Sequence, residues 1–188
     1  MFAPGRHTES ETLAGYLEAQ LESLRTAAFG LTEEQARATP TRSALSVGGL
    51  LKHAIYVITA RARRESGEEI TPETQALFTD SFALRDDETL EGTLAAYDAA
   101  VAAYLAEVRA VDPGAESIEP PAPWDGILEP TPIHERFYLV HHVEELARHA
   151  GHADIIREQL DGATAIELHH GERDLPGNPF VTPWKPGS

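Results

Sequence analysis

Apolar residues recur at three- and four-residue spacing in four stretches of the chain, and prolines separate these stretches. This spacing is typical of amphipathic α-helices, whose interiors exclude proline. The pattern predicts helices over about residues 8–29, 46–65, 87–109 and 131–160. Four helices with one apolar stripe each bury those stripes only against one another, so we expect an all-α four-helix bundle.

Residues that favour helix ends support these boundaries. Thr8 and Glu11 have the spacing of a capping box at the start of the first helix. We expect Thr131, which is followed by Pro132, to be the N-cap of the fourth helix. Gly162 is the expected stop for that helix, because glycine is common just beyond a helix end.

The segments between and beyond these helices also have predictable features. Short helices are expected over 32–38 and, within the long second connection, near 72–78. A long connection between the second and third helices favours a bundle with a crossover. The tail over 163–188 carries four prolines, and we expect it to lie over the bundle as a strap. No strand series is evident, so residues 1–188 are predicted to form a single helical domain.

The charge of the chain argues against two kinds of partner. The chain has 15 Lys and Arg against 31 Asp and Glu, which gives a formal charge of −16. Binding to nucleic acid and docking on an anionic membrane both need clustered Lys and Arg. Neither is therefore expected, and a small molecule is the more plausible substrate.

Cysteine is absent from the chain. Disulfides, thiolate zinc sites and a cysteine nucleophile are thereby excluded. The N-terminal segment lacks the apolar stretch of a signal peptide, and the longest apolar run, 99–106, is too short to span a membrane. These features predict a soluble cytoplasmic protein.

Histidine is concentrated in one part of the chain, where five of the nine histidines fall within 19 residues. Residues three or four apart share a helix face, so His141, Glu145, His149 and His152 form one stripe. A Glu and a His at this spacing can bind one metal ion in a bundle, with a further ligand from another helix. His53 is the only histidine of the first three predicted helices, and its segment is otherwise apolar.

Two histidine nitrogens and one carboxylate oxygen are a known ligand set for divalent metals. On zinc this set leaves an open position for water or substrate, and the same set binds non-haem iron. Zinc is the expected ion, with nickel or iron as alternatives. A simpler interpretation stays open, in which Glu145 and His149 form a surface ion pair and His53 is a hydrogen-bonded core residue.

Two further residues are candidates for substrate contacts. Arg148 either points into solvent or binds an anionic group of the substrate. Trp124, in the proline-rich connection, either borders a pocket or anchors the loop. The chain has no GxSxG, glycine-rich phosphate loop or dinucleotide fingerprint, so the histidine cluster carries the candidate chemistry.

Three segments resemble the DinB/YfiT-like superfamily, namely GGLLKHAIYV at 48–57, HHVEELARHAGHADIIREQLDG at 141–162 and PFVTPWKP at 179–186. The resemblance spans about residues 9–185 and is greatest to the actinobacterial branch of DinB-family and mini-circle proteins. It implies a four-helix bundle of up-down-down-up topology. It also allows a homodimer.

The resemblance further implies a metal triad. This triad is His/His/His in much of the superfamily and His/Glu/His in the branch of the mycothiol-dependent maleylpyruvate isomerase. Carried over by position, the ligands in this chain are His53, Glu145 and His149. His152 stands where many members have Gln. The isomerase has a second, C-terminal domain that this chain is not expected to contain, which argues against that particular reaction.

Members of the superfamily with assigned activities often transfer low-molecular-weight thiols, such as mycothiol or bacillithiol, to electrophiles. The resemblance therefore implies a metal-bound thiolate, supplied by a cosubstrate, that attacks an electrophilic carbon. His141, His142 and His152 would orient the ligands or transfer protons. Two alternatives stay open, which are a hydrolase that uses metal-bound water and a metal-binding or stress-response protein without catalysis.

Overall fold

The computed structural model describes residues 2–59, 71–119, 121 and 126–187. Across these residues the chain is mostly helical, as predicted. The longer helices are α1 (Glu9–Ala27), α3 (Val47–Ile58), α6 (Leu90–Ala110) and α7 (Glu135–Asp161). The shorter elements are α2 (Glu33–Arg37), α5 (Pro72–Asp80), α8 (Ala165–Glu172), β1 (Glu116–Glu119) and β2 (Thr131–His134).

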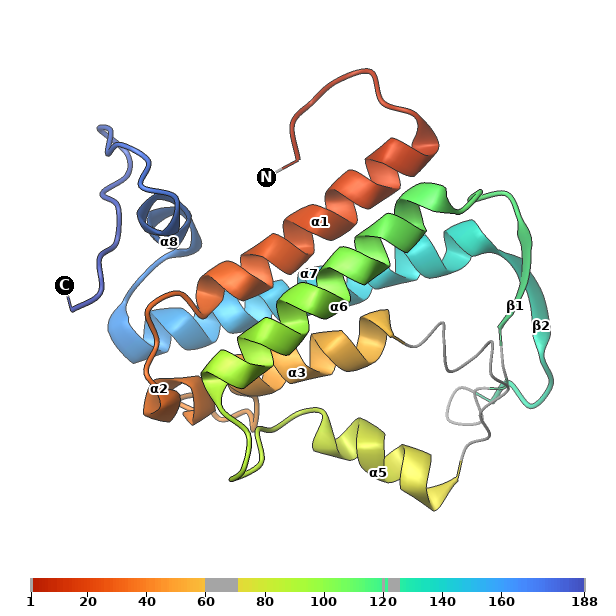
Figure 1. Ribbon diagram of the computed structural model, residues 1–188, viewed down its shortest axis with the longest axis horizontal. Coiled ribbons are helices and arrows are strands. Elements are labelled where there is room, and N and C mark those ends of the chain that lie inside the picture. The colour runs from red at the N-terminus through yellow and green to blue at the C-terminus, as the bar shows by residue number, and fades with distance from the viewer. Residues whose placement is uncertain (1, 60–70, 120, 122–125, 188) are drawn as a thin grey trace.

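The four longer helices pack side by side around a common core (Figure 1). Along the chain, α1 and α7 run in one direction, and α3 and α6 run in the other. Both α1 and α3 contact both α6 and α7, so apolar faces of all four helices meet. The core is built from the predicted apolar stripes and includes Leu17, Leu21, Leu50, Leu105 and Leu146.

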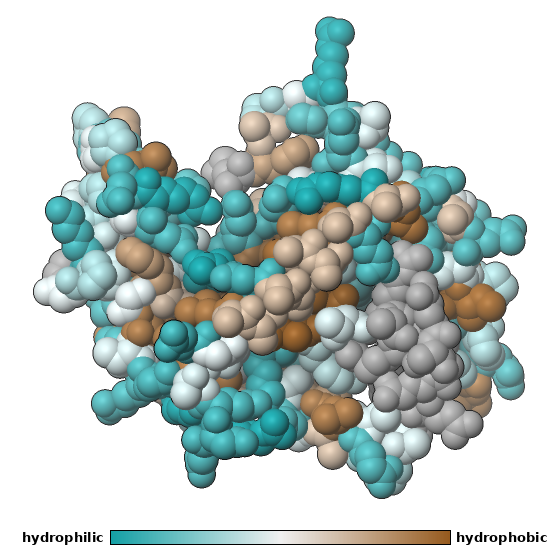
Figure 2. Space-filling view, viewed as in Figure 1, coloured by the Kyte–Doolittle hydropathy of each residue, from teal (hydrophilic) through white to brown (hydrophobic). Residues whose placement is uncertain are grey.

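The outer face of α6 is covered by alanine side chains. They form a pale brown diagonal band across Figure 2, and the exposed alanines of α6 include Ala95, Ala96, Ala99, Ala102, Ala103 and Ala106. Alanine has the highest helix propensity, so this face favours a helix without side-chain contacts. None of the described helices has the length and apolar character needed to cross a membrane.

Thr8 and Gly162 mark the start of α1 and the end of α7, as the sequence predicts. The Oγ1 atom of Thr8 accepts a hydrogen bond from the backbone N–H of Glu11 at 3.2 Å, and the Glu11 carboxylate accepts from the backbone N–H of Thr8 at 2.8 Å. The predicted capping box is thus confirmed. Gly162 follows α7 with a φ of 77°, a left-handed conformation that favours glycine. The expected short helices over 32–38 and near 72–78 are present as α2 and α5.

The prediction that Thr131 is the N-cap of the fourth helix is wrong. Residues 131–134 form β2, which pairs with β1 in an antiparallel hairpin that places Pro132 opposite Ile118. Pro132 has no N–H to donate and favours an extended conformation in the residue before it, which suits a strand edge. The helix α7 therefore begins at Glu135, and the expectation of a chain without strands is corrected by this hairpin.

The third predicted helix differs from the structure at its start, and the second can be compared only as far as residue 59. The predicted helix over 46–65 corresponds to α3, and its residues beyond 59 lie outside the described residues. The third begins at Leu90 instead of residue 87, because Thr89 Oγ1 caps it by accepting from the N–H of Gly92 at 3.0 Å. The N–H of Leu90 donates to the Glu33 carboxylate at 2.8 Å, so α2 helps to fix the start of α6.

The tail beyond α7 packs on the end of the bundle. Its first part forms α8, which was not predicted although Thr164 and Glu167 have the spacing of a capping box. Trp184 then lies edge-on to Phe29 with 5.6 Å between ring centroids, and its backbone N–H donates to the carbonyl of Glu167 at 3.0 Å. The tail therefore links α8 to the residues that follow α1.

Arg157 on α7 joins these parts through a side chain that is fully buried, with 0% exposed. Its guanidinium donates to the carbonyl oxygens of Ala27 at 2.8 Å and Phe29 at 2.7 Å, and to the Asp161 carboxylate at 2.9 Å. The guanidinium carbon lies 4.6 Å from the centroid of the Trp184 ring, within the range of a cation–π interaction. These contacts fix α7 against the C-terminal end of α1.

Candidate metal centre

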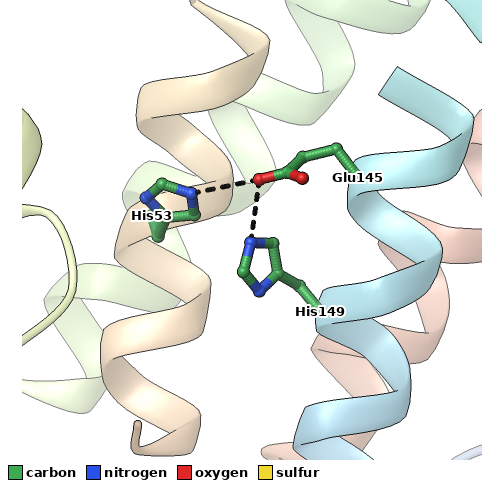
Figure 3. Close-up of side chains that lie close together, drawn as sticks. All are labelled: His53, Glu145 and His149. Carbon is green, nitrogen blue, oxygen red and sulfur yellow. Dashed lines mark hydrogen bonds and ion pairs between the residues drawn. The ribbon is translucent and has the colours of Figure 1, made fainter. Parts of the chain in front are cut away.

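Three of the predicted site residues converge between α3 and α7 (Figure 3). His53 reaches across from α3, while Glu145 and His149 project from successive turns of α7. The Oε1 atom of Glu145 lies 3.0 Å from Nε2 of His149 and 3.6 Å from Nε2 of His53. One ligand atom from each residue lies within 4.8 Å of the other two, so the group could hold one metal ion.

The three residues differ in their exposure to solvent. His53 is 1% exposed and His149 is 9% exposed, so both imidazoles are buried. The side chain of Glu145 is 27% exposed. Solvent therefore reaches this group of three from the side of the carboxylate, while the imidazoles are shielded by the bundle.

His149 also controls the ionisation of Glu145. Its hydrogen bond holds the pKa of the Glu145 carboxyl well below its usual range, although partial burial opposes this effect. The carboxylate is therefore ionised at neutral pH. An ionised carboxylate is the form that binds a metal ion.

The donor set fits a divalent ion of the zinc type. Zinc binds these nitrogen and oxygen atoms at about 2.0–2.2 Å, so two ligands of a tetrahedral ion lie about 3.3–3.6 Å apart. The measured separations from Glu145 to the two histidines, 3.0 Å and 3.6 Å, are close to this range. Three protein ligands leave one tetrahedral position for another molecule.

Side chains from the end of α5 surround His53. The ring of Phe82 stacks on the imidazole with 3.9 Å between centroids, and the ring of Phe78 lies edge-on at 5.8 Å. The Nδ1 atom of His53 lies 2.9 Å from Oγ of Ser81. Sequence reasoning missed these residues, because their segment has no periodic pattern and only the tertiary fold brings it to His53.

Three other predicted residues on α7 are exposed, and one of them adjoins the site. His152 is exposed beside the site, with its ring 5.7 Å from the ring of His149. His141 and Arg148 are exposed as well, and they interact with Glu144 at 3.9 Å and 3.8 Å. The structure thus brings His152 to the group of three and turns His141 and Arg148 towards Glu144.

His142 lies on the buried face of α7 and bonds to a different helix. Its Nδ1 atom is 2.7 Å from the hydroxyl oxygen of Tyr104 on α6. It precedes His149 by seven residues, which is about 10 Å along a helix. The remaining candidate, Trp124, lies outside the described residues.

The bond between Tyr104 and His142 provides a test of the role of His142. Replacing Tyr104 with Phe is expected to lower the free energy of unfolding by about 0.5–1.5 kcal/mol, the usual net value of one hydrogen bond. Zn²⁺ affinity should not change, because this bond joins α7 to α6 and not to α3. Urea denaturation and Zn²⁺ titration measure the two quantities.

Tyr97→Phe is the matched control, since the Tyr97 hydroxyl is also buried and donates to the carbonyl of Leu21 at 2.8 Å. Both variants should lose stability and keep their affinity for Zn²⁺. A tenfold loss of Zn²⁺ affinity in the Tyr104 variant alone would instead show that His142 acts on the metal site.

Comparison with known proteins shows the family of this chain. A family model described as mycothiol-S-transferase matches residues 12–162, so the chain belongs to the mycothiol-S-transferase family. This family is of the DinB/YfiT-like type, which confirms the resemblance predicted from the sequence.

The fold of the chain is similar to that of a solved structure. It is a conserved protein from Enterococcus faecalis, with a TM-score of 0.58 and 15% sequence identity over 84% of this chain and 99% of that chain. At this identity the likeness shows the fold alone. None of the curated proteins matches the chain.

Proposed function

We propose that this protein is a metal-dependent enzyme that transfers a low-molecular-weight thiol of the mycothiol type to an electrophile. The observation that carries the proposal is the convergence of His53, Glu145 and His149 in a member of the mycothiol-S-transferase family. We infer that these three residues are the ligands and that the ion is zinc. The donor atoms and their separations support both inferences.

In the proposed mechanism the ion activates the thiol, and the three residues bind the ion. A divalent ion, when bound, would lower the pKa of a coordinated thiol and so favour the nucleophilic thiolate. Glu145 would contribute a negative charge that partly neutralises the ion, and the buried His53 and His149 would bind the ion from the core side. The chain has no cysteine, so the cosubstrate supplies the attacking sulfur.

His152 is suited to receive the proton of the thiol, since it is exposed and adjoins His149. The sulfur then forms a bond to the electrophilic carbon while the leaving group departs with its electron pair. Arg148 and His141, on the outer side of the same helix, are suited to contact polar groups of the substrates.

We also infer that the described helices form one domain with the up-down-down-up topology of DinB-like proteins. The shared direction of α1 with α7 and of α3 with α6 supports this topology. The contacts that close the four helices around one core support a single domain.

The proposed activity predicts metal-dependent conjugation of a thiol. Zn²⁺-loaded protein mixed with mycothiol and monobromobimane should form the conjugate faster than the uncatalysed mixture. Removing the metal with EDTA should return the rate to background, because the proposal assigns activation of the thiol to the metal ion. Adding Zn²⁺ back should restore it, and fluorescence of the separated bimane conjugate measures the rate.

A panel of bacillithiol, glutathione and cysteine, run with the same electrophile, identifies the preferred thiol. If none of these thiols is conjugated in a metal-dependent way, the transferase proposal fails. A hydrolase or a non-catalytic metal-binding protein would then be the better interpretation.

A further inference from the structure

Ser81 makes two hydrogen bonds that together fix where its hydroxyl proton lies. Its Oγ atom donates to the carbonyl oxygen of Phe78 at 2.6 Å, and it lies 2.9 Å from Nδ1 of His53. A hydroxyl has one proton and two acceptor lone pairs. Because the proton is used on the Phe78 carbonyl, Oγ can only accept from His53.

This arrangement assigns the proton of the imidazole. Nδ1 of His53 must carry a hydrogen in order to donate to Ser81. In the neutral ring the other nitrogen, Nε2, then has a free lone pair, and Nε2 is the nitrogen that faces Glu145. Their separation of 3.6 Å is longer than a hydrogen bond, so Glu145 competes for the imidazole proton less strongly than Ser81 does at 2.9 Å.

The position of Ser81 is itself fixed from both sides. Ser81 is 3% exposed and follows α5, where its backbone N–H donates to the carbonyl of Leu77 at 3.0 Å. Lys52, the neighbour of His53 on α3, donates to the Asp80 carboxylate at 2.8 Å and to the Ala83 carbonyl at 3.1 Å. The segment that carries Ser81 is thus attached to the helix that carries His53.

We propose that Ser81 is a positioning residue that holds His53 in the tautomer ready to bind a metal ion through Nε2. This proposal rests on the metal site proposed above. Only His53 is held in this way, because Nδ1 of His149 is buried and has no hydrogen-bond partner among the described residues. The two histidines of the site therefore differ in whether a hydrogen bond at Nδ1 fixes the tautomer.

Loss of the Ser81 hydroxyl should favour the wrong tautomer. Without an acceptor at Nδ1, the proton is stabilised on Nε2 instead, where the Glu145 carboxylate attracts it. A metal ion must then displace this proton before it binds. Loss of the hydrogen-bond partner of a metal-bound histidine typically weakens metal binding by about 10–100-fold. We expect an effect of this size for Ser81→Ala.

The experiment compares Ser81→Ala with Ser81→Thr, which keeps a hydroxyl, and with Ser23→Ala. Ser23 is a matched control because its hydroxyl donates to the Ala19 carbonyl at 2.9 Å on α1, away from His53. Zn²⁺ affinity is measured by competition with a chromogenic chelator. Only Ser81→Ala should bind Zn²⁺ about 10–100-fold more weakly.

A second measurement reads the tautomer directly in the metal-free protein. Two-bond ¹H–¹⁵N spectra of the histidine rings should show neutral His53 with its proton on Nδ1 in the wild type, and on Nε2 in Ser81→Ala. A proton on Nε2 in the wild type, or equal Zn²⁺ affinity in the wild type and Ser81→Ala, would overturn the proposal. A wild type that binds no Zn²⁺ would refute the metal site instead, and the tautomer spectra would still decide the assignment of Ser81.

Discussion

Replacing Glu145 with Gln is expected to weaken Zn²⁺ binding by more than about 100-fold. This loss exceeds the usual effect of replacing a residue that only hydrogen-bonds to a metal ligand. The amide keeps the size of the side chain but removes the negative charge of the carboxylate. The Oε1 atom of this carboxylate accepts a hydrogen bond from His149 and lies 3.6 Å from Nε2 of His53. The ion would then be held by two buried imidazoles alone. Metal-dependent thiol transfer should fall to the uncatalysed rate.

Thermal unfolding gives a second measure of the same effect. Zn²⁺ at 100 times its dissociation constant should stabilise the wild type by about 2.7 kcal/mol. For a chain of this size that corresponds to a rise in Tm of about 5–11 °C. At the same concentration the Glu145 variant should gain almost nothing.

Glu144→Gln is the control for this substitution, because it makes the same chemical change at the next residue. Glu144 interacts with His141 and Arg148 on the exposed side of α7, outside the group of three. This variant should bind Zn²⁺ like the wild type. Equal loss of affinity in both variants would point to a general effect of negative charge, and full affinity in the Glu145 variant would contradict the ligand assignment.

Replacing Arg157 with Ala is expected to lower the free energy of unfolding by about 3–5 kcal/mol, as is typical when one partner of a buried ion pair is removed. The substitution leaves the Asp161 carboxylate, only 19% exposed, without a cationic partner. It also removes the donors to the carbonyls of Ala27 and Phe29. The expected fall in Tm is about 6–20 °C, measured by calorimetry.

Arg148→Ala provides the contrast on the same helix. Arg148 and Arg157 each interact with an acidic residue four positions away, but the Arg148 side chain is 68% exposed. Exposed pairs of this kind contribute about 0.3–0.5 kcal/mol, so the Arg148 variant should unfold almost like the wild type. Similar losses in the two variants would show that burial does not determine the contribution of Arg157.

The parts of the fold that could be predicted are those with a local signal. Each long helix has its own apolar stripe, and Thr8 and Gly162 act on residues only a few positions away. The hairpin of β1 and β2 has no such signal, because its strands pair across a proline-rich connection. The helix α8 was missed even though Thr164 and Glu167 have the same capping-box spacing as Thr8 and Glu11.

In the candidate site, too, the residues with a local sequence signal could be predicted and their partners from distant segments could not. The four-residue spacing of Glu145 and His149 predicts that they share a helix face, and His53 followed from its isolation in an apolar segment and from the family resemblance. Neither spacing nor composition indicates Ser81 as the partner of His53 or Tyr104 as the partner of His142. Both partners come from distant segments, which only the packed structure brings together.

Arg157 has a consequence for how this chain tolerates insertions and deletions. The residue lies eight positions beyond His149 on one continuous helix, and its bonds to the end of α1 fix the register of that helix. An inserted or deleted residue between them would rotate one group relative to the other by about 100°. The guanidinium and the His/Glu group could then no longer face their partners together. The spacing of this segment is therefore more strictly constrained than the identity of its exposed residues.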